Sequence, residues 1–161
     1  MIWITIFIYI CLFILFLQDI LYRHVHIVVL ILLFGVSVAQ QYLRFSNLII
    51  KIVSYNMGLF LFTFLLLTLY MAYKNRGFIN PFKNYFGLGD LFFYLTVSPL
   101  FMPDKFLFFF IISLLFAVLL HFCFRKISKH QTIPLAGYTA LLLILISGIE
   151  TCFHTFKLTL I

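Results

Sequence analysis

Charged residues are scarce in this sequence, and acidic residues are the scarcest. Charged side chains make up 9% of the 161 residues, whereas a soluble globular domain carries roughly 25%, so a soluble enzyme is excluded. Intrinsic disorder is excluded as well, because disordered chains have low hydrophobicity and 65% of this chain is hydrophobic. We therefore expect a polytopic membrane protein. Its acidic residues are so few that each can be weighed singly: Asp19, Asp90, Asp104 and Glu150.

Cysteine is also rare, and the motifs that hold metals are missing. The three cysteines, Cys11, Cys123 and Cys152, form no CxxC pair, and no HExxH sequence occurs, so no zinc or redox motif is present. We expect no metal and no other cofactor. The net charge is +7, but no basic run is dense enough for a nucleic-acid patch. The basic residues lie between apolar runs, where they indicate topology and contact with anionic lipid.

What the sequence has in abundance is apolar segments of membrane-spanning length. A helix needs about 20 apolar residues to cross the hydrocarbon core. Six stretches meet this requirement, and the connections between them are short. The sequence thus predicts one all-α transmembrane domain over 1–161 with six helices, at approximately 2–18, 27–43, 52–73, 84–103, 106–124 and 131–149.

Lysines and arginines in the connections predict the orientation. The first, third and fifth connections hold seven of them, and the opposite side holds four. Because cytoplasmic loops carry the excess of Lys and Arg, both termini are expected on the extracytoplasmic side. Asp19 and Asp90 would then lie at similar depth near the cytoplasmic face.

Asp90 is the strongest candidate for a functional residue. It lies in the fourth apolar segment, within Gly87-Leu88-Gly89-Asp90, and ionisable groups inside a membrane mark functional sites by default. Gly87 and Gly89 remove side chains from the approach to the carboxyl and permit unusual backbone geometry. A buried Asp paired with a loop cation, with glycines that serve helix packing, is the plainer alternative.

Asp19, at the end of the first segment, is the expected partner of Asp90. Alone it could be an interfacial helix end with Arg23 as its i,i+4 neighbour. Two carboxyls that approach closely cannot both ionise easily, so one keeps its proton and the other acts as a base, as in aspartic proteases. Such a pair activates water without a metal or a nucleophilic Ser or Cys.

These residues resemble those of the type IV prepilin peptidases and their archaeal preflagellin-peptidase relatives, the GxGD membrane aspartic proteases. The resemblance lies in Asp19 followed by Arg23, in the GxGD sequence ending at Asp90, and in Lys129 followed by Ile133 and Pro134. The chain departs from the family pattern in three places. Val25-His26-Ile27 stands for Ile-Pro-Asn, Phe92 for a Lys after GxGD, and Leu135-Ala136-Gly137 for Phe-Gly-Pro.

The resemblance implies an endopeptidase that cuts the short basic leader from prepilin-like precursors at the cytoplasmic face of the cell's cytoplasmic membrane. Asp19 and Asp90 would be the catalytic pair, supported by Gly87 and Gly89. Arg23, Lys129 and Pro134 would shape the mouth of the site or support it. Pro134 could simply start the sixth helix or belong to a flexible element beside the two carboxyls. The cysteine-bearing cytoplasmic domain of longer members is absent, so no methylation of the product is expected.

Two other interpretations stay open. The chain could be a divergent GxGD intramembrane protease with another substrate, and Pro134-Leu135-Ala136 is a scrambled echo of the Pro-Ala-Leu element of those enzymes. It could instead be a small membrane scaffold or transporter that uses the two Asp residues as a proton or cation site. Carboxyls that lie far apart on rigid helices, or transport without proteolysis of any leader peptide, would favour the scaffold or transporter.

Overall fold

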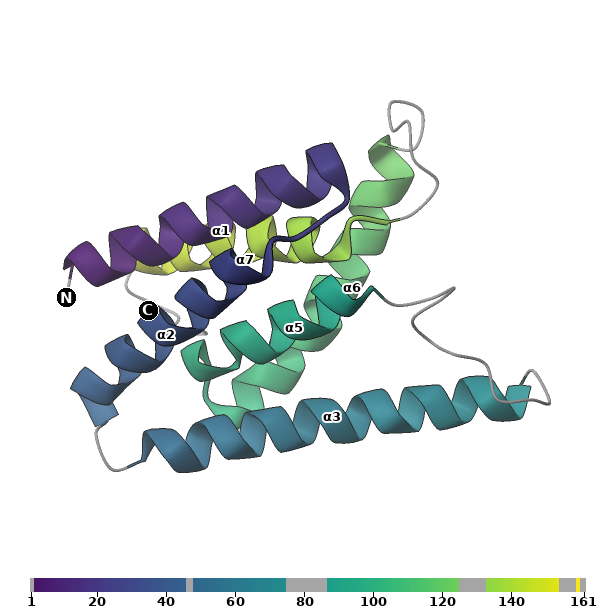
Figure 1. Cartoon of the computed structure of the whole chain (residues 1–161), viewed down its shortest axis with the longest axis horizontal. Helices are drawn as coiled ribbons and strands as arrows, with labels where there is room; N and C mark the ends of the chain where they lie inside the picture. The colour runs from purple at the N-terminus through teal and green to yellow at the C-terminus, as the bar shows by residue number, and fades with distance from the viewer. Residues whose placement is uncertain (1, 46–47, 75–86, 125–132, 154–158, 160–161) are drawn as a thin grey trace.

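The computed structural model describes residues 2–45, 48–74, 87–124, 133–153 and 159. Within these residues the chain is helical and has no strand, apart from an isolated bridge between Phe101 and Thr159. Figure 1 shows the arrangement. In chain order the helices are α1 (Ile2–Tyr22), α2 (Ile27–Phe45), α3 (Ile49–Lys74), α5 (Leu88–Val97), the 3-10 helix η1 (Ser98–Leu100), α6 (Pro103–Phe124) and α7 (Leu135–Phe153).

Four of the described helices are long and apolar enough to cross a membrane. They are Trp3–Tyr22, Ile27–Arg44, Ile49–Lys74 and Pro103–Cys123. Two other apolar helical segments, Leu88–Leu100 and Leu135–Glu150, are shorter. The predicted all-helical fold is confirmed, and the long apolar helices indicate a membrane protein. The fourth expected segment is helical over fewer residues than its apolar run suggested, whereas the helix of the sixth segment has the expected length but begins and ends four residues later.

The fourth segment is shorter because its helix stops well before the apolar run does. Pro99, which has no N–H to donate, lies in η1, and α6 begins at Pro103. Carbonyl groups freed at such a break need partners in an apolar environment. Asn56 of α3 supplies them, since its Nδ2 donates to the carbonyl oxygens of Ser98 (2.8 Å) and Phe101 (2.9 Å). One buried amide on a neighbouring helix thus stabilises the break.

An aromatic cluster joins α3, α5 and α6 in the core. The ring centroid of Phe60 lies 5.4 Å from that of Tyr94 and 5.5 Å from that of Phe110, and Tyr94 and Phe110 are 4.8 Å apart. These separations are within the range of favourable aromatic pairs. The buried Tyr94 hydroxyl forms a 2.7 Å hydrogen bond with Ser113 of α6. The cluster packs α5 against its neighbours and therefore holds the helix that contains Asp90 in place.

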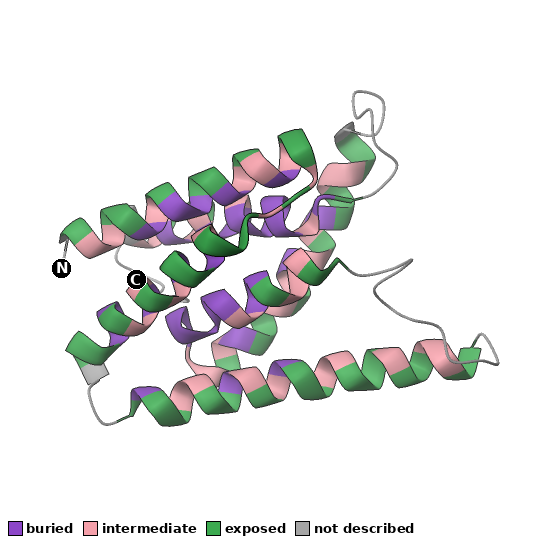
Figure 2. Ribbon diagram, viewed as in Figure 1, coloured by how far each residue is buried: buried purple, intermediate pink, exposed green. Residues whose placement is uncertain are grey.

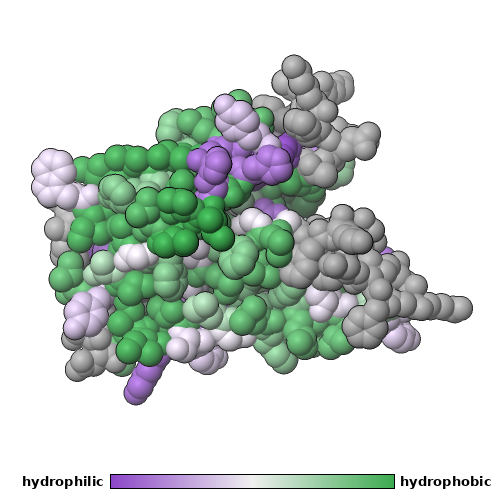
Figure 3. Space-filling model, in the orientation of Figure 1, coloured by the Kyte–Doolittle hydropathy of each residue, from purple (hydrophilic) through white to green (hydrophobic). Residues whose placement is uncertain are grey.

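The outer surface is strongly apolar. Buried positions face the interior of the bundle in Figure 2, and hydrophobic residues cover most of the face in Figure 3. Helix α3 buries only Ile49, Asn56 and Phe60, and its other apolar residues are half-buried or exposed. Trp3 and Tyr73, near helix ends, are 83% and 86% exposed, as expected of aromatic side chains at a membrane interface. This surface suits contact with lipid.

Candidate active site

The two candidate aspartates come together at one end of the bundle. Helix α1 ends there, and α5 and α7 begin there, on the right of Figure 1. Asp19 occupies the last turn of α1 and is 7% exposed. Asp90 is the third residue of α5 and is half-buried. The fold therefore places both carboxyls in one region, although they lie on different helices.

The first turn of α7 binds both carboxyls. The Ala136 N–H donates to Oδ1 of Asp90 at 2.8 Å, and the Gly137 N–H donates to Oδ2 of Asp19 at 2.6 Å. The first N–H groups of a helix have no acceptor within it, and the helix dipole favours negative charge at this end. Two adjacent donors thus hold two carboxyls side by side, and Asp19 is close enough to interact electrostatically with Asp90.

The second carboxylate oxygen of Asp90 caps the N-terminus of α5, the helix to which Asp90 belongs. Gly87 is the N-cap of α5 (φ −73°, ψ 143°), and its N–H donates to Oδ2 of Asp90 at 3.2 Å. This is the half of a capping box in which the third helical residue reaches back to the N-cap. Both carboxylate oxygens of Asp90 therefore have backbone donors, which orient the side chain.

The two glycines of the GxGD sequence have different surroundings. A Cβ on Gly87 would lie 2.9 Å from Oδ2 of Asp90, which is closer than real side chains tolerate. A Cβ on Gly89 would meet only the side chain of Val25, at 3.5 Å, an ordinary packing distance. Gly87 is thus the glycine next to the carboxyl, whereas Gly89 faces the segment that joins α1 to α2.

Arg23 and Tyr138 surround Asp19. Arg23 directly follows α1 with a left-handed backbone (φ 56°), and its N–H donates to the carbonyl oxygen of Asp19 at 3.1 Å. Its positive charge acts on both Asp19 and Tyr138, and Tyr138 is near enough to Asp19 to interact with it as well. The expected placement of Arg23 beside the carboxyl pair fits this arrangement.

Pro134 lies directly before α7, and its carbonyl accepts the N–H of Tyr138 at 3.0 Å. Of the two roles considered for Pro134, the structure has it at the start of a helix, where its fixed φ is suitable. Lys129, the other candidate from this segment, lies outside the described residues. Among the described residues, no group of three or more His, Cys, Asp or Glu side chains could hold a metal ion.

The sequence did not reveal Ala136 and Gly137 as site residues. Both contribute backbone N–H groups, which every residue except proline has, so residue type gives no sign of their role. The nearest signal was the family-like stretch that ends in Leu135-Ala136-Gly137, which gave no indication of what the N–H groups would bind. The donors became visible only when α1, α5 and α7 were placed together.

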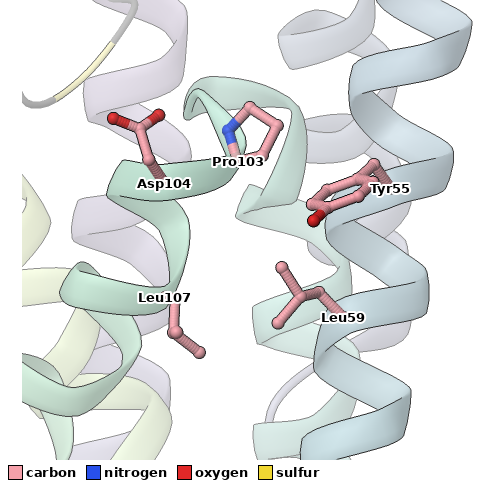
Figure 4. A pocket seen from close by; sticks show the side chains of 5 residues that line it. All are labelled: Tyr55, Leu59, Pro103, Asp104 and Leu107. Carbon is pink, nitrogen blue, oxygen red and sulfur yellow. The ribbon is translucent and has the colours of Figure 1, made fainter.

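A cavity elsewhere in the molecule is not part of this site. It has a volume of about 530 Å³, opens between α3 and α6, and is drawn in Figure 4. Because it lies where α6 begins, it is at the opposite end of α5 from Asp90. No residue of the carboxyl pair lines it. Its lining residues are Tyr55, Leu59, Pro103, Asp104 and Leu107.

Comparison of the chain with protein-family models, with curated proteins and with solved structures found no match.

Proposed function

We propose that this protein is a membrane-embedded aspartic endopeptidase that removes the basic leader from prepilin-like precursors. The observation that carries the proposal is the pair of carboxyls bound by adjacent N–H groups of α7. The resemblance of the Asp19 segment and the GxGD sequence to prepilin peptidases supplies the reaction and the substrate class.

The proposed reaction needs only the two carboxyls and a water molecule. One carboxyl is ionised and takes a proton from the water, which attacks the carbonyl carbon of the scissile peptide. The other carboxyl is protonated and donates its proton to the carbonyl oxygen, which gives a tetrahedral gem-diol. The first carboxyl then returns its proton to the departing amine as the C–N bond breaks, and the second takes a proton from a gem-diol hydroxyl as the new carboxyl group forms. Hydrogen bonds from Ala136 and Gly137 orient the two carboxyls, while their remaining lone pairs serve the chemistry.

The proposal includes an arrangement in the membrane. Six helices span the cytoplasmic membrane, both termini lie on the extracytoplasmic side, and the site opens near the cytoplasmic face. The Lys and Arg bias of the connections supports this orientation. The substrate presents its leader to this face and its hydrophobic helix to the bilayer. Reporter domains fused at the N-terminus, the C-terminus and the connection after α3 test the orientation, since the first two should be extracytoplasmic and the third cytoplasmic.

The decisive experiment is cleavage by purified protein. Liposomes that contain the protein are mixed with peptides that have a basic leader, a Gly before the cut and a hydrophobic helix, and mass spectrometry locates the cut. Wild type should cut after the Gly, and Asp19→Asn and Asp90→Asn should not. Asp104→Asn is the matched control because Asp104 is exposed and remote from the site. A folded wild type that leaves every such peptide intact would refute the proposal, as would an active Asn variant at position 19 or 90.

A further inference from the structure

Consecutive backbone N–H groups at the start of α7 bind the two carboxyls. Ala136 and Gly137 are consecutive, and each N–H donates to a different aspartate. In the first turn of a helix these N–H groups all point toward its N-terminal end, at a spacing that the backbone fixes. Helix α7 packs against both α1 and α6, so it is held in place. The spacing of its amides therefore sets the spacing of the carboxyl oxygens that they bind.

Position 137 is tight for a side chain. A Cβ there would lie 3.1 Å from both Cβ and Oδ2 of Asp19 and 3.4 Å from the carbonyl oxygen of Phe16. The Asp19 Cβ and the Phe16 carbonyl are fixed by the backbone of α1, whereas Oδ2 ends the Asp19 side chain. A methyl group would therefore push α1 away from α7 by a few tenths of an ångström or turn the Asp19 carboxyl. A Cβ on Gly148, further along the same helix, would meet no neighbouring atom within 4 Å. The close approach is therefore a property of position 137 and not of α7 as a whole.

We infer that the first turn of α7 is a template that sets the geometry of the carboxyl pair, with Gly137 as its positioning residue. The inference rests on the proposed function for its catalytic consequence. Gly137 touches no substrate and supplies no proton. It acts through Asp19, by allowing the helix to approach closely enough for its N–H to bind the carboxyl.

Gly137→Ala tests the catalytic consequence, with Gly148→Ala as the matched control on the same helix. The assay is cleavage of the leader peptide, with kcat and KM measured separately. Misplacement of a catalytic group by about 1 Å costs on the order of 100-fold, and the contacts at position 137 require a shift of only a few tenths of an ångström, so Gly137→Ala should lower kcat by roughly 3- to 10-fold. KM should change by less than about twofold, because the substrate contacts are untouched. Gly148→Ala should match wild type. A folded Gly137→Ala with wild-type kcat would overturn the inference.

A second measurement separates this inference from the proposed function. Unfolding in SDS is followed for wild type, Gly137→Ala, Asp19→Gly and the double variant. If the added methyl collides with Asp19, Gly137→Ala should destabilise the protein when Asp19 is present and should cost much less in the Asp19→Gly background. Additive effects would overturn the template even if the enzyme cuts peptides. If wild type cuts no peptide, the proposed function fails and this cycle alone decides the template.

Gly137→Ala could also fail to fold, and the double variant covers that case. If the collision with Asp19 causes the failure, Asp19→Gly should restore a folded protein. Failure of both variants to fold would contradict the inference, because another cause would then be required. A variant that is less stable but retains wild-type kcat in its folded fraction would assign Gly137 a purely structural role.

Discussion

Replacing Asp90 by Asn and by Leu separates its structural role from its chemical one. The two substitutes have almost the same shape, and both remove the charge. Asn keeps an oxygen that can accept the Ala136 N–H, whereas Leu does not. The difference in stability between the two variants therefore measures the contribution of the hydrogen-bond acceptor alone. A comparison of either variant with wild type would also include the effect of losing a buried charge beside Asp19.

The expected magnitude follows from the surroundings of the two donors. Ala136 is fully buried, so its N–H would have no acceptor in the Leu variant, at a cost of about 1–3 kcal/mol. The Gly87 N–H belongs to an exposed residue, so water can replace the carboxyl at little cost. We expect Asp90→Leu to be less stable than Asp90→Asn by about 2 kcal/mol, most of it due to Ala136.

The measurement is SDS unfolding followed by far-ultraviolet circular dichroism, because the single tryptophan, Trp3, is 83% exposed and would report poorly on the core. The same pair of substitutions at the exposed Asp104 is the control and should differ by less than about 0.5 kcal/mol. Equal stability of the Asn and Leu variants at position 90 would refute the reasoning, since the Ala136 N–H would then not depend on this carboxyl. Both variants should be unable to cut peptides.

Three further predictions follow from the same geometry. Gly87→Ala should reduce cleavage sharply, because the new methyl would lie 2.9 Å from the Asp90 carboxyl, whereas Gly89→Ala should be active and at least as stable as wild type. Peptide cleavage measures activity and SDS unfolding measures stability, and equal activities of the two variants would contradict this prediction. Asn56→Ala should destabilise the protein by about 1–3 kcal/mol, since the Phe101 carbonyl loses the Asn56 amide and the Ser98 carbonyl keeps only the Phe101 N–H at 3.4 Å. An unchanged unfolding curve would count against this prediction. The rate of peptide cleavage should be bell-shaped in pH, since one carboxyl must be protonated and the other ionised; a flat profile across the acidic and neutral range would exclude a two-carboxyl mechanism.

The helices could largely be predicted from the sequence because lipid imposes a simple requirement. Long apolar runs without charge form helices whose lengths follow the bilayer, and the described helices lie where these runs do. Errors arose at polar residues near the ends. The third segment was predicted to begin after Lys51, but α3 begins at Ile49, because an exposed Lys at a helix end can extend its charge toward water. The break at Ser98–Leu100 depended on Pro99 together with Asn56, which lies on another helix.

Only the carboxyl side chains of the candidate site could be predicted from the sequence. Asp19 and Asp90 stood out because carboxyls are rare in apolar segments, and topology placed them at similar depth. Their backbone partners on α7 could not be predicted, since N–H groups have no residue signature. The different surroundings of Gly87 and Gly89 could not be predicted either, because the atoms next to each glycine depend on how the helices pack.

The cost of two carboxyls at the start of α7 is an argument for the proposed reaction. A helix start is satisfied by one Ser, Thr, Asp or Asn, which contributes about 1 kcal/mol. Two carboxyls held side by side cannot both ionise easily, and burial adds a desolvation cost. A purely structural cap for α7 would therefore be more stable with one carboxyl than with two. The second carboxyl adds a cost at the start of α7, and the proposed reaction, which holds one proton between two acids, gives a reason for it.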